Sequence, residues 1–297
     1  MLQNNLTLDV ALGVTIPLRH ARGRVVRVGP ALDAILANHN YPAPLERMLA
    51  EALALTALLG SLLKDPNGQL TLQAQTKGGI VDLLVCDYLG GELRGYVRHD
   101  PAALADSPRD PSLRSLFGDG YLAITFDQPA TDERYQGIVP LEGESLAEAA
   151  QSYFAQSEQI PSIVRLAARR TEGGWTAGGL LFQHLPEGEE GRERLHTRMD
   201  HPEWDHVAVL AGSIRAEELT DPTLPLDDLA WRLFHEEGEV RMLAPVSLDR
   251  GCRCDPEYVR SVIARFPVEE RAEMADEEGV IRVNCEFCAT SFPINFD

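Results

Sequence analysis

The sequence predicts an α+β protein with three parts. These are an N-terminal mixed α/β core with antiparallel sheets over residues 1–186, a helical linker over 187–248 and a small C-terminal domain over 249–297. Strand-like segments joined by glycine turns alternate with helix-like segments up to Pro186, which is typical of α+β proteins. Charged residues then become more frequent, and the last 46 residues contain four of the five cysteines.

The core should be built mainly from antiparallel hairpins. Gly78-Gly79, Gly90-Gly91 and Gly173-Gly174 each separate two strand-like segments, as hairpin turn residues do. The expected strands are Arg22–Val28, Leu70–Gln75, Ile80–Tyr88, Glu92–Arg98, Tyr121–Asp127, Arg134–Val139, Ser162–Ala168 and Trp175–Phe182.

Three helices should accompany these strands. A short one begins at Gly29-Pro30, because proline suits the first helical position. The segment Pro44–Leu63 is rich in alanine and leucine and apolar on most sides, so it should form a buried helix that ends before the turn residues Asp65-Pro-Asn-Gly68. Leu146–Ala155 is the third helix.

The linker is acidic and only weakly apolar. From Glu187 to Arg250 the chain has 16 acidic and 7 basic residues. One short helix should start near Pro202 and another after Pro225, with Gly238 as its stop. Short helices persist in water only when they pack against something, so this region should be marginally stable. The apolar residues expected on these helices are Trp204, Val207, Leu210, Ile214, Leu229, Leu233 and Phe234.

The cysteines form two closely spaced pairs, Cys252-x-Cys254 and Cys285-x-x-Cys288. Paired thiolates let one loop supply two ligands to a tetrahedral ion, and a second loop then completes the set. Four sulfurs at about 2.3 Å from Zn²⁺ leave no open coordination position, which indicates a structural site. The sequence therefore predicts one zinc ion bound by these four cysteines.

Zinc should matter for the folding of this C-terminal module. Residues 251–297 are near the size at which a hydrophobic core alone fails, so the metal-binding energy would largely be folding energy. Thiolates are also the groups that peroxide and hypochlorous acid attack. Oxidation to disulfides would remove the ligands and release zinc, which predicts an oxidation-triggered unfolding switch. Zinc retained after peroxide treatment would contradict this hypothesis.

Two other functions are compatible with cysteine pairs. A thiol–disulfide oxidoreductase would use Cys285-x-x-Cys288, but it needs a metal-free thiol of low pKa, and such motifs normally lie beside a βαβ unit. A zinc ribbon would bind nucleic acid. The module has five arginines, no lysine and ten acidic residues, a balance that disfavours a phosphate-rich partner.

Cys86 is expected to be a packing residue, although the sequence does not decide whether it joins the redox chemistry, and for three linker histidines a ligand or catalytic role is the lesser alternative. Cys86 lies in the apolar segment Leu83-Leu-Val-Cys86 and should be a buried small hydrophobe. His196, His201 and His206 are five residues apart, which does not place them on one helical face, so they should face solvent in the linker.

Composition disfavours several classes of function. The net charge is −19, which repels phosphate backbones. No stretch of eighteen apolar residues is present, so no membrane span is expected, and Met1 to Val10 lacks the features of a signal peptide. A cytoplasmic location with reduced thiols is therefore expected. The phosphate-binding loop of ATPases is also missing from the sequence.

These features resemble one family over nearly the whole chain. The sequence is similar to the bacterial redox-regulated heat-shock protein 33, the 33 kDa chaperonin family, in the spacing and C-terminal position of both cysteine pairs. Other matching segments are Leu229-Ala-Trp-Arg-Leu-Phe-His-Glu-Glu237, Gln156-Ser-Glu-Gln159, Gln75-Thr-Lys-Gly78 and Arg94-Gly-Tyr-Val97.

The resemblance implies an ATP-independent holdase rather than an enzyme. Under reducing conditions zinc would occupy the four cysteines and the chaperone would be inactive. Oxidants combined with heat would produce the disulfides Cys252–Cys254 and Cys285–Cys288, release zinc, and unfold the zinc domain and the linker. The oxidised protein would form a homodimer. The linker residues expected to bind unfolding client proteins, although buried in the reduced state, are Trp204, Val207, Leu210, Leu229 and Phe234.

Overall fold

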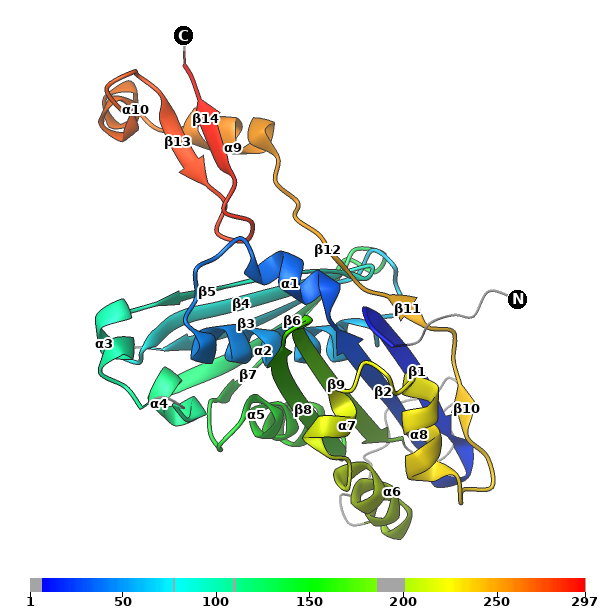
Figure 1. The fold of residues 1–297 in the computed structure, drawn as a ribbon. Helices are drawn as coiled ribbons and strands as arrows, with labels where there is room; N and C mark the ends of the chain where they lie inside the picture. Colours follow the sequence, from blue (N-terminus) through cyan, green and yellow to red (C-terminus); the bar gives the residue numbers. More distant parts are fainter. Residues whose placement is uncertain (1–6, 77, 109–110, 186–200, 297) are drawn as a thin grey trace.

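The structure, a computed structural model, describes residues 7–76, 78–108, 111–185 and 201–296. Two six-stranded sheets pack around the long helix α2 (Ala43–Gly60), and a small C-terminal module of residues 252–296 projects from one end (Figure 1). Because α2 contacts strands of both sheets, its alanine- and leucine-rich surface is buried on most sides. The α+β class predicted from the sequence is confirmed.

The first sheet has the strand order β10-β1-β2-β9-β8, with β11 also paired to β1. Its long strands are antiparallel, and alternate side chains enter two different cores. Val26 and Leu181 belong to the core around α2, whereas Val25 and Leu180 face the linker helices. The long strands are β1 (Val10–Ile16), β2 (Ala21–Val28), β8 (Ser162–Thr171) and β9 (Gly174–His184).

The second sheet has the strand order β12-β5-β4-β3-β6-β7. Gly90 and Gly91 connect β4 to β5 with φ values of 57° and 99°, a left-handed turn that glycine accommodates. The long strands are antiparallel, and only the short β12 joins β5 in parallel. The long strands are β3 (Gln69–Thr76), β4 (Val81–Leu89), β5 (Glu92–His99), β6 (Gly120–Gln128) and β7 (Glu133–Pro140).

Short helices close the ends of the core. Asp100, Ser112 and Ser145 cap three of them by accepting hydrogen bonds from first-turn N–H groups. These helical segments are α1 (Pro30–Leu36), α3 (Pro101–Ala105), α4 (Leu113–Phe117), α5 (Leu146–Tyr153), the 3-10 turn η1 (Pro17–Arg19) and the π-helical turn η2 (Phe154–Glu158).

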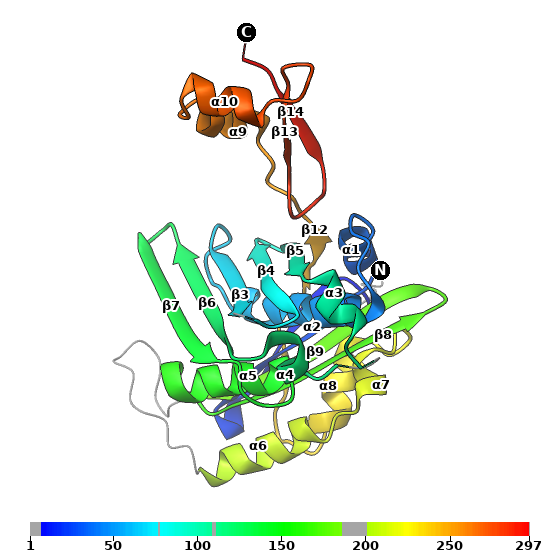
Figure 2. The same cartoon turned by 90° about the vertical axis from the view of Figure 1, so that its left-hand side faces the viewer.

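The described part of the linker contains three helices that cover the outer face of the first sheet (Figure 2). They are α6 (Pro202–Gly212), α7 (Ala216–Leu219) and α8 (Leu226–Phe234). Trp204, Val207 and Phe234 are buried there, and the Phe234 ring centroid lies 4.7 Å from that of Phe182 on β9. The linker helices therefore depend on the sheet for their packing.

Residues 241–250 form an extended segment, here called the strap, that runs from the edge of one sheet to the edge of the other (Figure 1). It contains three two-residue strands. These are β10 (Arg241–Met242) and β11 (Val246–Ser247), which pair with β1, and β12 (Asp249–Arg250), which pairs with β5. The strap connects the linker helices to the C-terminal module.

The C-terminal module contains two short helices and one hairpin. The helices are α9 (Pro256–Ile263) and α10 (Val268–Met274), and the hairpin strands are β13 (Ile281–Asn284) and β14 (Ser291–Ile294). Figure 2 shows the hairpin pointing its turn toward the core.

Several element boundaries differ from the prediction. Strand β1 was not predicted, and α2 ends at Gly60 rather than Leu63, because the chain tightens into 3-10-type hydrogen bonds at Leu62 and Leu63. Helix α8 ends at Phe234, before Gly238. Three residues beyond the end of the helix, the Glu237 side chain binds Arg19 and His206.

Candidate metal centre

One loop of the metal centre lies between the strap and α9. Cys252 and Cys254 follow β12, and Asp255 begins the helix immediately afterwards. The Asp255 carboxylate accepts hydrogen bonds from two first-turn backbone N–H groups, so the direction of the chain after Cys254 is defined. The pairing of β12 with β5 defines its direction before Cys252.

The other loop is the turn of the β13–β14 hairpin. The Cys285 N–H donates to the Thr290 carbonyl (2.9 Å), and the Ala289 N–H donates to the Cys285 carbonyl (2.8 Å). Ala289 adopts a left-handed φ of 54°, which reverses the chain after Cys288. This tight turn directs Cys285 and Cys288 to the same side.

The four sulfurs lie close together. Cys252 Sγ lies 3.1 Å from Cys254 Sγ and 3.7 Å from Cys285 Sγ, and Cys254 Sγ lies 3.4 Å from Cys288 Sγ. All four are within 4.8 Å of one another. These separations exceed the disulfide bond length of about 2.05 Å. They approach the edge of about 3.8 Å expected for four sulfurs around zinc. The four free thiols fit one tetrahedral metal ion.

Local hydrogen bonds distinguish Cys288 from Cys252 and Cys254. Burial raises the pKa values of Cys252 and Cys254. Burial acts on Cys288 too, but hydrogen bonds with Thr290, Cys254 and Cys252 outweigh it and lower the pKa of Cys288 to about 6. Thr290 Oγ1 lies 3.2 Å from Cys288 Sγ. The thiolate is the form that binds metals and reacts with oxidants.

The module around this cluster has almost no core of its own. Neither α9 nor α10 buries a residue. Within residues 252–296, the buried apolar side chains are those of Ile281, Cys288 and Ile294. A segment this short with so little buried apolar surface needs another source of stability. The cysteine cluster is the feature that can supply it.

The hairpin turn docks on the core through Phe287, which lies between the two cysteines. The Phe287 ring contacts Tyr96 of β5 edge-on, with centroids 4.9 Å apart, and the Arg94 guanidinium lies 4.0 Å from the ring centroid. His39 Nε2 lies 3.3 Å from the Phe287 carbonyl oxygen. The metal centre is therefore in direct contact with the second sheet.

The other loop docks through Arg253, which lies between Cys252 and Cys254. Its guanidinium donates to Gln69 Oε1 (3.1 Å) and to Asp87 Oδ2 (3.3 Å). Arg94 shares the same carboxylate at 2.6 Å. In both loops, a side chain that lies between the two cysteines therefore contacts β3, β4 or β5. The spacing of the cysteines alone did not indicate these contacts.

A buried arginine joins the core to the linker. Arg27 of β2 is fully buried and donates hydrogen bonds to the backbone carbonyls of Leu219 (2.8 Å), Leu224 (2.6 Å) and Glu218 (2.9 Å). Burial lowers the pKa of Arg27 to about 10. Its acceptors exist in this arrangement only while the α7–α8 connection is folded. Sequence reasoning missed this residue because an arginine in a strand normally indicates an exposed position.

The histidines only partly match their predicted exposure. His206 is exposed and bonded to Glu237 (2.6 Å), as a surface residue would be. His201 is half-buried: it caps α6, and its ring centroid lies 5.0 Å from that of His184, so its prediction as solvent-facing was wrong. His196 lies outside the described residues.

Cys86 is fully buried, as predicted. Burial raises its pKa, so this thiol stays protonated and inaccessible. The apolar linker residues are also placed as expected for the reduced protein: Trp204, Val207, Leu229 and Phe234 are buried, and Leu210 is partly buried.

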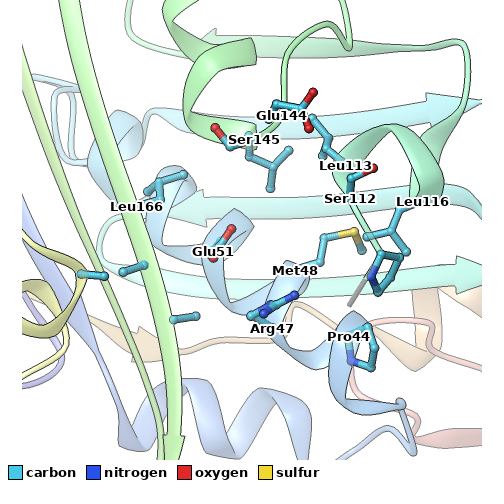
Figure 3. A pocket seen from close by; sticks show the side chains of 15 residues that line it. Pro44, Arg47, Met48, Glu51, Ser112, Leu113, Leu116, Glu144, Ser145 and Leu166 are labelled. Carbon is cyan, nitrogen blue, oxygen red and sulfur yellow. The ribbon is translucent and has the colours of Figure 1, made fainter. Parts of the chain in front are cut away.

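A pocket of about 510 Å³ lies between α2, α4, α5 and β8 (Figure 3). Figure 3 shows Arg47, Met48 and Glu51 of α2 lining one side of it. Its serines, Ser112 and Ser145, accept backbone hydrogen bonds as helix caps, and none of the described residues that line it is a histidine or a cysteine.

Fold and site together define a two-sheet α+β protein with a docked helical segment and a four-cysteine metal-binding module. A family profile described as Hsp33 protein matches residues 9–295. The 33 kDa chaperonin of Caulobacter vibrioides is 42% identical over 97% of this chain and 95% of its own. That of Salmonella typhimurium is 36% identical over 92% and 88%. The chain belongs to the Hsp33 family of chaperones, which are not enzymes.

The fold is also similar to that of a solved 33 kDa chaperonin. The crystal structure of the 33 kDa chaperonin from Thermotoga maritima matches with a TM-score of 0.76 over 97% of this chain and 95% of that one, at 22% sequence identity. Among the described residues, no helix is both long and apolar enough to cross a membrane.

Proposed function

We propose that this protein is a redox-regulated, ATP-independent holdase whose switch is a zinc ion bound by Cys252, Cys254, Cys285 and Cys288. One observation carries the proposal: the four sulfurs converge within 4.8 Å in a module whose helices bury nothing. Zinc, when bound, would cross-link the two cysteine loops through its four sulfur ligands. The reduced, zinc-loaded protein keeps its linker folded and is inactive.

Oxidation removes the metal ligands. We propose the pairs Cys252–Cys254, whose sulfurs are 3.1 Å apart, and Cys285–Cys288, which share one hairpin turn. Each disulfide forms as two thiols lose two electrons and two protons to the oxidant. One molecule of hydrogen peroxide is thereby reduced to two molecules of water. The four thiols of one chain therefore consume two molecules of hydrogen peroxide.

Loss of the module propagates through the strap to the linker. Without its closed loops the module no longer presents Phe287 and Arg253 to the second sheet, and β12 loses the anchor at its C-terminal end. Residues 187–248 act as the unfolding linker, 249–297 as the switch domain and 1–186 as the stable core. The helices that release the buried faces of Trp204, Val207 and Phe234 are short, so they do not persist alone.

The released apolar surfaces bind unfolding client proteins. The oxidised chain also has exposed apolar surface to share with a second copy, which supports a homodimer in the active state. The reaction requires thiols that are reduced at rest, which supports a location in the cytoplasm.

Light scattering from a thermally unfolding client protein tests this function. The reduced protein should leave aggregation unchanged, and the protein pretreated with peroxide at mild heat should suppress it without ATP. The Cys86→Ser variant should behave like the wild type, because Cys86 is fully buried and is not one of the four clustered cysteines. Equal suppression by reduced and oxidised protein would contradict a redox switch.

A further inference from the structure

Strand β1 forms one margin of the first sheet's long strands. On one side it pairs with β2 along its whole length. On the other side, within the described residues, it pairs only with the two-residue strands β10 and β11 of the strap. Without the strap, this side of β1 would therefore be an open edge of the sheet.

The sequence of β1 would allow such an open edge to pair with other extended chains. Its seven residues, Val-Ala-Leu-Gly-Val-Thr-Ile, include no charge and no proline, and β-branched residues dominate. Short segments of this kind pair readily with other chains, and proteins normally protect edges with charged residues. Strand β5, the other strand covered by the strap, carries Glu92, Arg94 and Arg98 and is protected in this way. The two covered edges are not equivalent.

The backbone groups that the strap occupies are identified by two hydrogen bonds. The Leu243 N–H donates to the Gly13 carbonyl and the Leu248 N–H to the Asp9 carbonyl, each at 2.8 Å. Because the N–H and C=O of one strand residue point to the same side, Ala11, Gly13 and Thr15 direct their backbone groups toward the strap. Residues at even positions bond to β2.

The side chains of β1 complete the surface. Val10, Leu12, Val14 and Ile16 are buried in the core that the linker helices form with the first sheet. One event, release of the linker and its strap, therefore uncovers an apolar row of side chains and an unpaired row of backbone groups on the same strand.

We propose that the edge of β1, uncovered when the strap leaves, binds extended apolar segments of unfolding proteins by adding them to the first sheet as a new strand. This inference rests on the proposed redox-triggered release. The strap itself demonstrates the binding mode, since it occupies the edge as an antiparallel extended segment. Backbone hydrogen bonds are common to all polypeptides, so strand addition explains how one site accepts many unrelated sequences.

Residue-resolved amide hydrogen exchange tests the proposal on the full-length protein. In the reduced state the amides of Ala11 and Thr15, which are paired with Val246 and Arg241 of the strap, should be protected. After oxidation they should exchange rapidly, while the amides of Leu12 and Val14, which face β2, stay protected. Addition of a thermally unfolding client should restore protection at Ala11 and Thr15.

A pair of variants isolates the role of the strap. Leu243→Pro removes the N–H that binds Gly13, whereas Leu243→Ala removes the same half-exposed side chain and keeps the N–H. The probe is a fluorescein-labelled peptide with the sequence of residues 240–248, measured by fluorescence polarisation. With zinc still bound, the proline variant should bind it about threefold to tenfold more tightly than the alanine variant, since one backbone hydrogen bond of the competing strap is lost.

The outcomes separate this inference from the function on which it rests. If the oxidised protein suppresses aggregation while the amides of Ala11 and Thr15 stay protected throughout, or exchange freely with client bound, the edge is not the binding site and the holdase function stands. If protection returns with rising protein concentration and no client, the edge binds a second copy and the proposal is wrong. If oxidation activates nothing, both fail.

Discussion

Phe287, placed between two cysteines of the four-thiol cluster, packs edge-on against Tyr96 in the middle of β5, with ring centroids 4.9 Å apart. The Arg94 guanidinium lies over the same ring. The turn that carries Cys285 and Cys288 is thus also the part of the module that contacts the core. Any change that opens the turn removes this contact, which couples the state of the thiols to the second sheet.

The Phe287→Ala variant should keep its zinc but hold the module less firmly. Loss of the aromatic and cation–π contacts removes about 1–2 kcal/mol of docking free energy. The peroxide concentration that releases half of the zinc should fall, as measured with a metal-sensitive dye. Phe266→Ala, in the connection between α9 and α10, serves as the control. An unchanged midpoint in both variants would show that docking does not influence the switch.

The Arg27→Met variant should loosen the linker in the reduced, zinc-loaded protein. Three backbone carbonyls lose a charged donor, and because methionine cannot replace it, the linker should lose about 2–4 kcal/mol of stability. Limited proteolysis within residues 201–234 should then proceed without oxidant. Arg170→Met, which removes a surface ion pair with Glu46, should leave cleavage unchanged. Equal cleavage of the wild type and the Arg27 variant would contradict this role.

Chelation of zinc under reducing conditions should unfold the module and spare the core. The hairpin β13–β14 has few buried apolar side chains to hold it without the metal, whereas the sheets around α2 have a large core of their own. Hydrogen exchange should show rapid exchange in residues 281–294 and continued protection in β3 and β4. If the hairpin amides remain protected after chelation, zinc is not the source of the module's stability.

The carboxylate of Glu237 should make linker stability depend on pH. Burial opposes its ionisation, but hydrogen bonds with Arg19 and His206 prevail and lower its pKa. A lowered folded-state pKa stabilises the fold above the unfolded value of about 4.3, and this contribution is lost as the pH falls through the folded pKa. Tryptophan fluorescence between about pH 3 and pH 7 should therefore report linker opening at the acid end.

The Glu237→Gln variant provides the comparison. It should open more readily at neutral pH, by about 1–2 kcal/mol, and its opening should vary less with pH because the titrating group is gone. Glu236→Gln, at the exposed neighbouring position, should retain the wild-type profile. Identical profiles for the wild type and the Glu237 variant would rule out this carboxylate as the source of the pH dependence.

The metal centre was predictable because its information is local. Two cysteine pairs with short spacing determine a ligand set whatever fold surrounds them, and the structure brings all four together. The hairpin at Gly90-Gly91 was equally accessible, since a left-handed two-residue turn requires glycine there. Linker helices that start at Pro202 and after Pro225 follow from proline at helix starts and apolar spacing.

The contacts that connect the parts were not predictable, because they join residues far apart in sequence. Arg27 lies 192 positions from Leu219, and no sequence pattern around Arg27 indicates that it donates to a buried carbonyl there. The strap strands have two residues each, too few to produce an alternating pattern. Strand β1 is not followed by glycine turn residues, and the chain reverses through the proline-containing 3-10 turn η1 instead. The hairpin that β1 forms with β2 therefore lacks the usual sequence signal of a hairpin.

The most direct test follows zinc release and chaperone activity in one oxidation time course. Reduced protein is treated with peroxide at mild heat, and each sample is divided between a metal-sensitive dye and a light-scattering assay with an unfolding client. We expect one zinc ion per chain to be released and aggregation suppression to rise with the same progress curve. Suppression that develops while zinc stays bound, or complete zinc release with no suppression, would contradict the switch.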